Sequence, residues 1–190
     1  MALHLAIIIG SIRAGRLGPV VADWFRDRAE QHRDFRVDLI DPADCALPDR
    51  HADSAETAPA VVRELGERLH KADAFVMVTP EYNHSYPAAL KNVIDWYVDE
   101  WRAKPVGFVS YGGVAGGLRA VEALRLVFPE LHATTIRDGV CFTNVWERLD
   151  ESGRLTDTAR ADKAADVMLA QLAWWATALR NHRHAEPYRA

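Results

Sequence analysis

The chain has 190 residues, of which 49% are hydrophobic and 26% are charged, and its formal net charge is −4. This composition excludes a disordered chain, a collagen-like chain and a low-complexity polymer, and the length predicts one domain that spans residues 1–190. No stripe of lysine and arginine runs along the sequence, so we expect neither a nucleic-acid partner nor a polybasic membrane anchor.

Short apolar runs that suit buried strands alternate with stretches of helical periodicity. Strands are expected at residues 3–9, 35–40, 74–79, 105–110 and 132–136. Helices are expected at about residues 19–29, 61–69, 86–101, 121–128 and 156–181, with a long loop at 41–59 and a polar tail at 182–190. This alternation predicts an α/β fold with a parallel sheet covered on both faces by helices. Ligands of such folds bind at the carboxyl ends of the strands.

The cysteines and the apolar segments indicate the compartment. Cys45 and Cys141 lie far apart, and no C-x-x-C motif suggests a zinc site or a redox pair. The first apolar run does not follow the basic segment of a secretory leader. Residues 164–179 are apolar but too few for a membrane helix, which needs about 20 residues. We therefore expect the protein in the reducing cytoplasm, without a membrane partner.

The loop at residues 10–18 follows a predicted strand and opens a predicted helix. Helix N-terminal N–H groups attract phosphate, and Ser11, Arg13 and Arg16 add side-chain donors. A P-loop is excluded because Arg16 and Leu17 stand where lysine and serine or threonine belong, and G-x-G-x-x-G fails at Ile12. The loop thus predicts a metal-free site for one phosphate monoester. A solvated turn is the alternative.

The loop at residues 80–87 combines polar groups with aromatic rings. Asn83 and the backbone are suited to the heteroatoms at the edge of a flat ring, and Tyr82 to its face. For Glu81 and His84, the alternative is a hydrogen-bonded pair within the loop that has no chemical role.

The loop at residues 110–117 contains four glycines, which allow close backbone approach to a ligand. A hydrolase elbow is excluded because Phe108 stands where G-x-S-x-G needs glycine before Ser110, and no metal-binding spacing occurs among the histidines. One phosphate, one flat ring and no nucleophile suit a cofactor that carries its own chemistry, and FMN fits each part.

Three motifs together carry a family resemblance. They are G-S-x-R-x-G-R-x-G at residues 10–18, P-E-Y-N at 80–83 with L-K-N at 90–92, and S-Y-G-G at 110–113 with G-G at 116–117. The chain resembles the NADPH-dependent FMN reductase family over residues 3–131. In many relatives a serine stands where this chain has Arg16.

The resemblance implies a flavodoxin-like three-layer sandwich with a five-stranded parallel sheet and non-covalent FMN. By the resemblance, the phosphate is held by Ser11, Arg13, Arg16 and Gly18. The ring is bordered by Pro80, Glu81, Tyr82 and Asn83, and its pocket is completed by Ser110, Tyr111, Gly112 and Gly113, with Gly117 near the edge. No residue is assigned as a catalytic acid or base.

Relatives of this family are usually dimers or tetramers, so a homodimer or homotetramer is expected. Trp96, Tyr97 and Trp101 of the predicted helix at 86–101 are candidates for the subunit contact, and core packing is the alternative. The same two interpretations are open for Trp174 and Trp175.

The resulting hypothesis is an NAD(P)H-dependent flavin reductase. Bound FMN would take hydride from NADPH or NADH and pass electrons to free flavin, a quinone or another small acceptor. Two alternatives stay open. One is a flavodoxin-type electron carrier without nicotinamide turnover, although such carriers are more acidic. The other is a regulatory protein that has kept the fold but binds no FMN.

Overall fold

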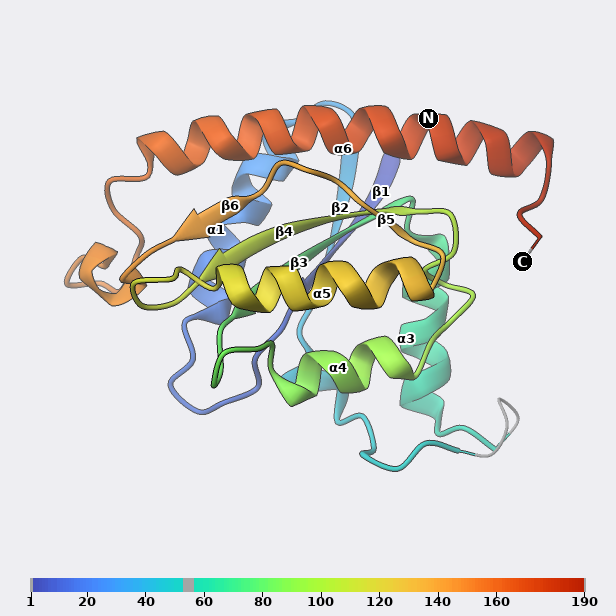
Figure 1. The fold of residues 1–190 in the computed structure, drawn as a ribbon, viewed down its shortest axis with the longest axis horizontal. Coiled ribbons are helices and arrows are strands. Elements are labelled where there is room, and N and C mark those ends of the chain that lie inside the picture. Colours follow the sequence, from blue (N-terminus) through green and yellow to red (C-terminus); the bar gives the residue numbers. More distant parts are fainter. Residues whose placement is uncertain (1, 53–56, 190) are drawn as a thin grey trace.

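A computed structural model describes residues 2–52 and 57–189, and residues 53–56 of the expected long loop lie outside the described residues. Its elements alternate as the sequence predicts (Figure 1). The strands are β1 (Leu3–Ile9), β2 (Phe35–Ile40), β3 (Ala74–Pro80), β4 (Pro105–Tyr111), β5 (Thr134–Thr135) and β6 (Val140–Phe142). The helices are α1 (Gly18–Gln31), α2 (Pro42–Cys45), α3 (Ala60–Lys71), α4 (Ala88–Asp95), α5 (Leu118–Glu130) and α6 (Ala159–Ala185), with the 3-10 helix η1 (Val145–Arg148) before α6.

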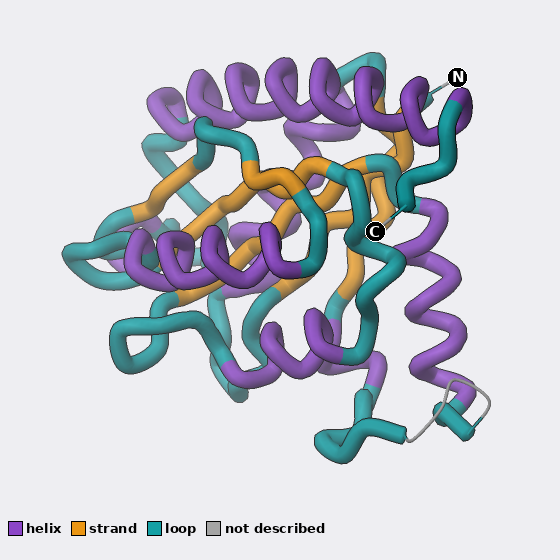
Figure 2. Tube along the Cα trace, turned by 45° about the vertical axis from the view of Figure 1, so that its right-hand side comes forward, coloured by secondary structure: helices purple, strands orange, loops and turns teal. Residues whose placement is uncertain are grey.

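The sheet has the strand order β2-β1-β3-β4-β5, and all its pairings are parallel. This is the flavodoxin-like order. Helices α1 and α6 pack on one face, and α3, α4 and α5 pack on the other (Figure 2). Strand β1 shows why both faces are covered, since Leu5 and Ile7 belong to the first core and Ala6 and Ile8 to the second. The predicted three-layer fold is confirmed.

The fifth strand differs from its prediction. Residues 132–136 yield only β5, which pairs with Pro105 and Val106 at the start of β4. A second segment, β6, pairs with the end of β4 through Val109, Ser110 and Tyr111. Between the two segments, Asp138 leaves the sheet and bonds Gln171 of α6 through both its backbone N–H and its carboxylate. The sheet therefore has a sixth strand, which extends the edge beside β4 beyond the predicted fifth strand at 132–136.

The helix expected at 86–101 covers only 88–95, and two of its three candidate rings for a subunit contact pack inside the protein. Trp101 is fully buried and Tyr97 is 4% exposed. Trp96 is half-buried and donates its indole N–H to the Pro48 carbonyl. Core packing is therefore the correct interpretation for Trp101 and Tyr97. On α6, Trp174 is 66% exposed, whereas Trp175 packs against the core.

The last helix is longer than predicted. It ends at Ala185 and not near Asn181, so the first residues of the expected polar tail are helical. His182 accepts the cap hydrogen bond from Glu186, and Arg183 donates to the Ala103 carbonyl. Within the described part of the chain, no helix is long and apolar enough to cross a membrane.

The amino end of the sheet holds a buried cation whose titration should affect stability. Lys104 is 5% exposed, and its ammonium donates to the Leu69 and His70 carbonyls at the end of α3. Burial, and then Arg183, lower its pKa from 10.5 to about 8. The unfolded chain therefore holds more protons than the folded chain between these two values. The free energy of unfolding should gain a contribution of roughly 3 kcal/mol from Lys104 as pH rises through this window.

Urea unfolding of wild type and Lys104→Met at several pH values between 7 and 10 tests this prediction. Other groups titrate in both proteins, so the difference between the two pH profiles reports Lys104 alone. The wild type should gain stability relative to Lys104→Met as pH rises. Parallel profiles would contradict the prediction.

Candidate functional site

The three loops singled out in the sequence meet at one edge of the sheet. Strand register places Ile9 beside Val78, and Thr79 beside Ser110, so β1, β3 and β4 end together. The Gly10 N–H donates to the Val78 carbonyl at 2.8 Å, which joins the first loop to β3 directly. The carboxyl ends of adjacent parallel strands thereby form the rim on which a ligand can bind.

The first loop offers donors that nothing in the described chain occupies. The backbone N–H groups of Ile12, Ala14, Leu17 and Gly18 make no hydrogen bond with other described residues, and no side chain caps α1. Arg13 is exposed, and its guanidinium has no partner in the described part of the protein. Free N–H groups at a helix N-terminus beside an unpaired guanidinium suit a phosphate group.

Arg16, by contrast, is already paired. Its guanidinium forms a bidentate ion pair with Asp41, which directly follows β2, and both N–O distances are 2.6 Å. It also donates to the Ser11 carbonyl. The side chains of Arg16 and Asp41 are only 16% and 17% exposed. The hydrogen bonds that Arg16 donates to Asp41 raise the pKa of Arg16 above its usual value, against the effect of burial. Arg16 therefore braces the first loop by linking the Ser11 carbonyl to Asp41.

This pairing predicts that Arg16→Ala harms folding more than it harms phosphate binding. Removing Arg16 leaves the mostly buried Asp41 carboxylate without its ion-pair partner and with only the Ala43 N–H as a donor, which should lower the free energy of unfolding by about 1–2 kcal/mol. The affinity for an FMN phosphate should fall less than tenfold, because Asp41 already neutralises the charge of the guanidinium. Thermal unfolding without FMN and a fluorescence titration with FMN measure the two effects. A large loss of affinity with unchanged stability would show that Arg16 contacts the phosphate.

The second loop is a tight turn that contacts the first. The N–H groups of Tyr82 and Ser85 each donate to the other's carbonyl, and Asn83 and His84 between them have φ values of 48° and 73°. Positive φ at both central residues is the geometry of a two-residue hairpin turn, and Asn tolerates it well. The Tyr82 hydroxyl lies 2.5 Å from the hydroxyl of Ser11, which is fully buried. Tyr82 thus covers Ser11 and ties the two loops together.

Glu81 faces the third loop. Its carboxylate pairs with the guanidinium of Arg119 at 2.5 Å and accepts the Arg119 backbone N–H at 3.2 Å, in the first turn of α5. The alternative pair with His84 is not formed, since both carboxylate oxygens of Glu81 bond Arg119. Glu81 therefore fixes α5 against the second loop. Because its carboxylate is bound to Arg119, it can border a ligand ring only as part of this ion pair.

The third loop is shaped by glycine at the positions where it turns. Gly116 and Gly117 have φ values of 57° and 84°, and a Cβ on Gly116 would meet the Cys141 sulfur at 2.2 Å. Ser110 is buried and its hydroxyl lies 3.5 Å from the Val140 carbonyl, so it can meet a ligand only through its backbone. Gly112 and Gly113 are part-exposed and leave the backbone open to a flat group.

Tyr111 carries the unsatisfied polar group at this rim. Its hydroxyl is buried and has no hydrogen-bond partner in the described structure. It lies 3.0 Å from the position that a Cβ on Gly18 would take, at the start of α1. Burial, and then Tyr82, raise the pKa of Tyr111, so the group is a neutral donor. The unpaired Tyr111 hydroxyl at the start of α1 and the free N–H groups of the first loop suit the phosphate of FMN. The open glycine backbone of the third loop suits its flat ring.

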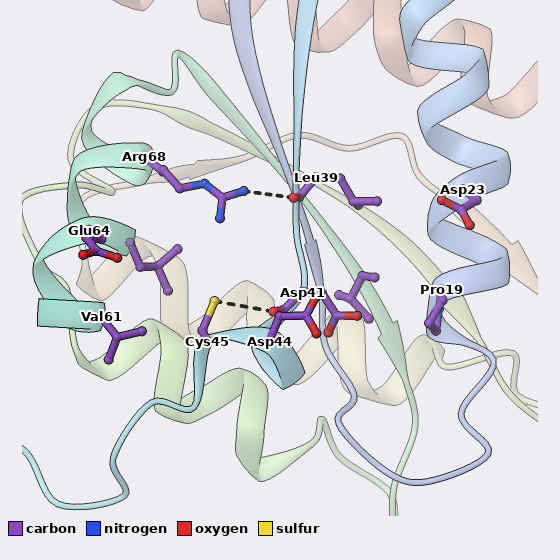
Figure 3. A pocket seen from close by; sticks show the side chains of 11 residues that line it. Pro19, Asp23, Leu39, Asp41, Asp44, Cys45, Val61, Glu64 and Arg68 are labelled. Carbon is purple, nitrogen blue, oxygen red and sulfur yellow. Dashed lines mark hydrogen bonds between the residues drawn. The ribbon is translucent and has the colours of Figure 1, made fainter.

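A cavity of about 420 Å³ lies on the other side of Asp41, between β2, α1 and α3 (Figure 3). Its walls include Asp23, Asp44 and Glu64, and the Arg68 guanidinium is bound to Asp38 and to the Leu39 carbonyl. Asp23 pairs with Arg26, but Asp44 and Glu64 make no ion pair with a described residue. Unpaired carboxylates repel a phosphate dianion, so this cavity does not extend the three-loop site.

Three residues at this rim were not identified from the sequence. Asp41 holds Arg16, Arg119 holds Glu81, and Trp146 of η1 packs beside Gly113. Asp41 had a usable signal, because it directly follows a predicted strand that ends at the same rim. The other two depend on how α5 and β6 pack, which no local pattern reports. No group of three or more histidine, cysteine, aspartate or glutamate side chains gathers as a metal site among the described residues.

Comparison with known proteins places this chain in a family. The family model of NADPH-dependent FMN reductases matches residues 3–147. An NAD(P)H-dependent FMN reductase of Schizosaccharomyces pombe is 35% identical over 60% of this chain, and the match spans 60% of that protein's length. A quinone reductase of Escherichia coli is 36% identical over 69% of this chain and 72% of its own length.

The solved structures agree. The flavoenzyme NAD(P)H:(acceptor) oxidoreductase FerB from Paracoccus denitrificans superposes with a TM-score of 0.76 at 25% identity, covering 93% of this chain and 98% of its own. A Streptococcus pneumoniae flavodoxin shares the fold at 16% identity and a TM-score of 0.59, over 90% of this chain and 98% of its own. The chain belongs to the NADPH-dependent FMN reductase family, oxidoreductases of flavodoxin-like fold that use FMN with NAD(P)H as electron donor.

Proposed function

We propose that this chain binds FMN at the three-loop rim and uses NADPH or NADH to reduce a small acceptor of the quinone or flavin class. The observation that carries the proposal is the set of unpaired donors on the first loop, which faces open glycine backbone on the third. Relatives named as quinone reductases from Escherichia coli and Burkholderia sp. support this acceptor class.

In this proposal the chain binds and orients, and no side chain acts as a general base. Arg13 and the N–H groups at the start of α1 bind the phosphate, while Arg16 braces their loop. Ser11 takes part only through its backbone, because Tyr82 covers its hydroxyl. The second and third loops border the ring through Tyr82, Asn83 and the backbone of residues 110–113, with Pro80, Glu81 and Gly117 at the edges. Bound FMN supplies the two-electron chemistry. For a quinone the overall reaction is NAD(P)H + H⁺ + quinone → NAD(P)⁺ + hydroquinone.

A flavodoxin-type electron carrier is the second candidate, because a flavodoxin shares the fold. Such a carrier would bind FMN but oxidise no nicotinamide. The net charge of −4 favours the reductase, since carriers of this type are more acidic.

We further propose that the protein is a homodimer or homotetramer in the cytoplasm. Leu126 on α5 and Val167 on α6 leave large apolar side chains exposed, which supports self-association. Cys45 and Cys141 are both free thiols, which suits a reducing compartment. Light scattering of the purified protein measures the mass of the assembly.

A visible spectrum recorded before and after adding FMN, and then NADPH without oxygen, tests the function. Flavin that binds and is bleached by NADPH supports the reductase. Flavin that binds but stays oxidised with both NADPH and NADH would favour the carrier. A protein that takes up no flavin would overturn the interpretation of all three loops and would favour the regulatory alternative.

A further inference from the structure

Trp146 lies at the same rim as the three loops, although it follows a different strand. Strand β6 pairs with the end of β4, with Ser110 beside Cys141 and Tyr111 beside Phe142. The chain leaves β6 and reverses at Asn144, whose φ is 45°, directly into η1. Figure 1 shows this orange segment next to the loop between β4 and α5. The strand pairing thus brings residue 146 to the third loop.

The segment that carries Trp146 is fixed at both ends. The N–H groups of Asn144 and Val145 donate to the carbonyls of Gly113 and Gly112 at 3.0 and 3.1 Å, and the Gly112 N–H donates to the Phe142 carbonyl at 3.1 Å. At the other end, Thr156 donates its backbone N–H and its hydroxyl to the Arg148 carbonyl. Val145 is buried in the core. The indole is therefore held on a rigid support, as a binding residue needs to be.

The indole itself has almost no partner. It is 57% exposed, and its N–H makes no hydrogen bond with any described residue. Its edge lies against the third loop at Gly113, where a Cβ would come within 3.3 Å of the ring. Val114 and Leu118 of the same loop and of α5 are 89% and 53% exposed. Large apolar side chains gathered at a rim and left open to water mark a binding surface.

We propose that Trp146 is the side wall against which a flat, apolar electron acceptor of the quinone class packs when it reaches the flavin. The inference rests on the proposed function, because it assumes FMN between the second and third loops. An uncharged ring gains from contact with indole and aliphatic surface, whereas NADH and NADPH carry charged phosphates that such a surface does not bind. Two electrons and two protons convert the quinone to the hydroquinone, with NAD(P)H as the reductant.

The test compares two acceptors in wild type, Trp146→Ala and Trp146→Phe, all loaded with FMN. A naphthoquinone must pack beside the flavin, whereas ferricyanide is a hydrophilic anion that takes electrons without stacking. The ratio of kcat/KM for naphthoquinone to kcat/KM for ferricyanide should fall at least tenfold in Trp146→Ala. Trp146→Phe, which keeps an aromatic ring, should restore most of this ratio. Trp174→Ala, which removes another exposed indole far from the rim, is the matched control and should leave the ratio unchanged.

A binding measurement checks the same contact without turnover. Naphthohydroquinone, which does not reduce FMN, is titrated into the oxidised holoprotein, and the shift of the flavin spectrum gives its Kd. This Kd should rise at least tenfold in Trp146→Ala and not in Trp174→Ala. An unchanged ratio and Kd, or an equal loss with both acceptors, would overturn the role of Trp146 while leaving the reductase function intact. A wild type that reduces neither acceptor with NADPH would instead overturn the proposed function, and this inference with it.

Discussion

Replacing Arg13 with alanine is expected to weaken FMN binding by about tenfold to hundredfold, because a charged hydrogen bond to phosphate contributes about 1.5–3 kcal/mol. Arg13 is exposed and its guanidinium has no partner among the described residues. Its free donors make it the side chain of the first loop that is best placed to meet a phosphate. The apo protein should lose almost no stability, since no native contact is removed. Titration of the apo protein with FMN, followed by flavin fluorescence, measures the effect.

Arg33 supplies a matched control for this prediction. It is also exposed and unpaired in the described structure, but it follows α1 near the opposite edge of the sheet. Arg33→Ala removes the same charge and should leave the FMN affinity within about twofold, since surface charges a Debye length of about 10 Å or more away are screened. An equal loss of affinity in both variants would mean that net charge, and not a local contact, governs binding.

Trp101→Ala is expected to lower the free energy of unfolding by about 3–5 kcal/mol, the range for removing a large buried aromatic side chain. The indole is fully buried and packs edge-on against Phe75 and Phe128, with ring centroids 4.6 and 5.7 Å away. Its N–H donates to the carbonyls of Ile94, in the last turn of α4, and of Tyr97, just after it. Urea unfolding of the apo protein measures the loss.

Two further variants make this measurement decisive. Trp174→Ala removes an exposed indole and should change the stability by no more than about 0.5 kcal/mol. Trp101→Phe keeps an aromatic ring in the core and should cost clearly less than Trp101→Ala, so it gives a measurable value if the alanine variant does not fold. If Trp101→Ala lowered the free energy of unfolding no more than Trp174→Ala does, the core packing of Trp101 would be contradicted.

The sequence is informative where a physical pattern is local. The strand at residues 3–9 is an almost unbroken apolar run, and the structure places its side chains in both cores. Pro19 fits the first turn of a helix, and α1 begins at Gly18. The three loops at residues 10–18, 80–87 and 110–117 follow strands that end at one rim. Their meeting could be predicted from the rule that the carboxyl ends of parallel strands lie at one edge of the sheet.

Contacts between distant residues explain the differences. Arg16 pairs with Asp41, 25 positions away, and Glu81 with Arg119, 38 positions away, so an arginine that suits phosphate by type is already occupied. The helix at 86–101 ends early because Trp101 turns into the core against Phe75 and Phe128. Strand β6 pairs with the end of β4, and it is separate from β5 because Asp138 between them bonds Gln171 of α6. Predicting any of these contacts requires knowing which helices and strands pack together.

Lys104, with its acceptors at the end of α3, lies at the amino edge of the sheet, opposite the edge where β1, β3 and β4 end. The two edges share no side-chain partner among the described residues, so substitutions at one should add to substitutions at the other without coupling. Thermodynamic independence of this kind has a practical use in protein engineering. Assay buffers above pH 8, where deprotonation of Lys104 should stabilise the fold, are therefore expected to keep poorly folding rim variants folded enough to assay.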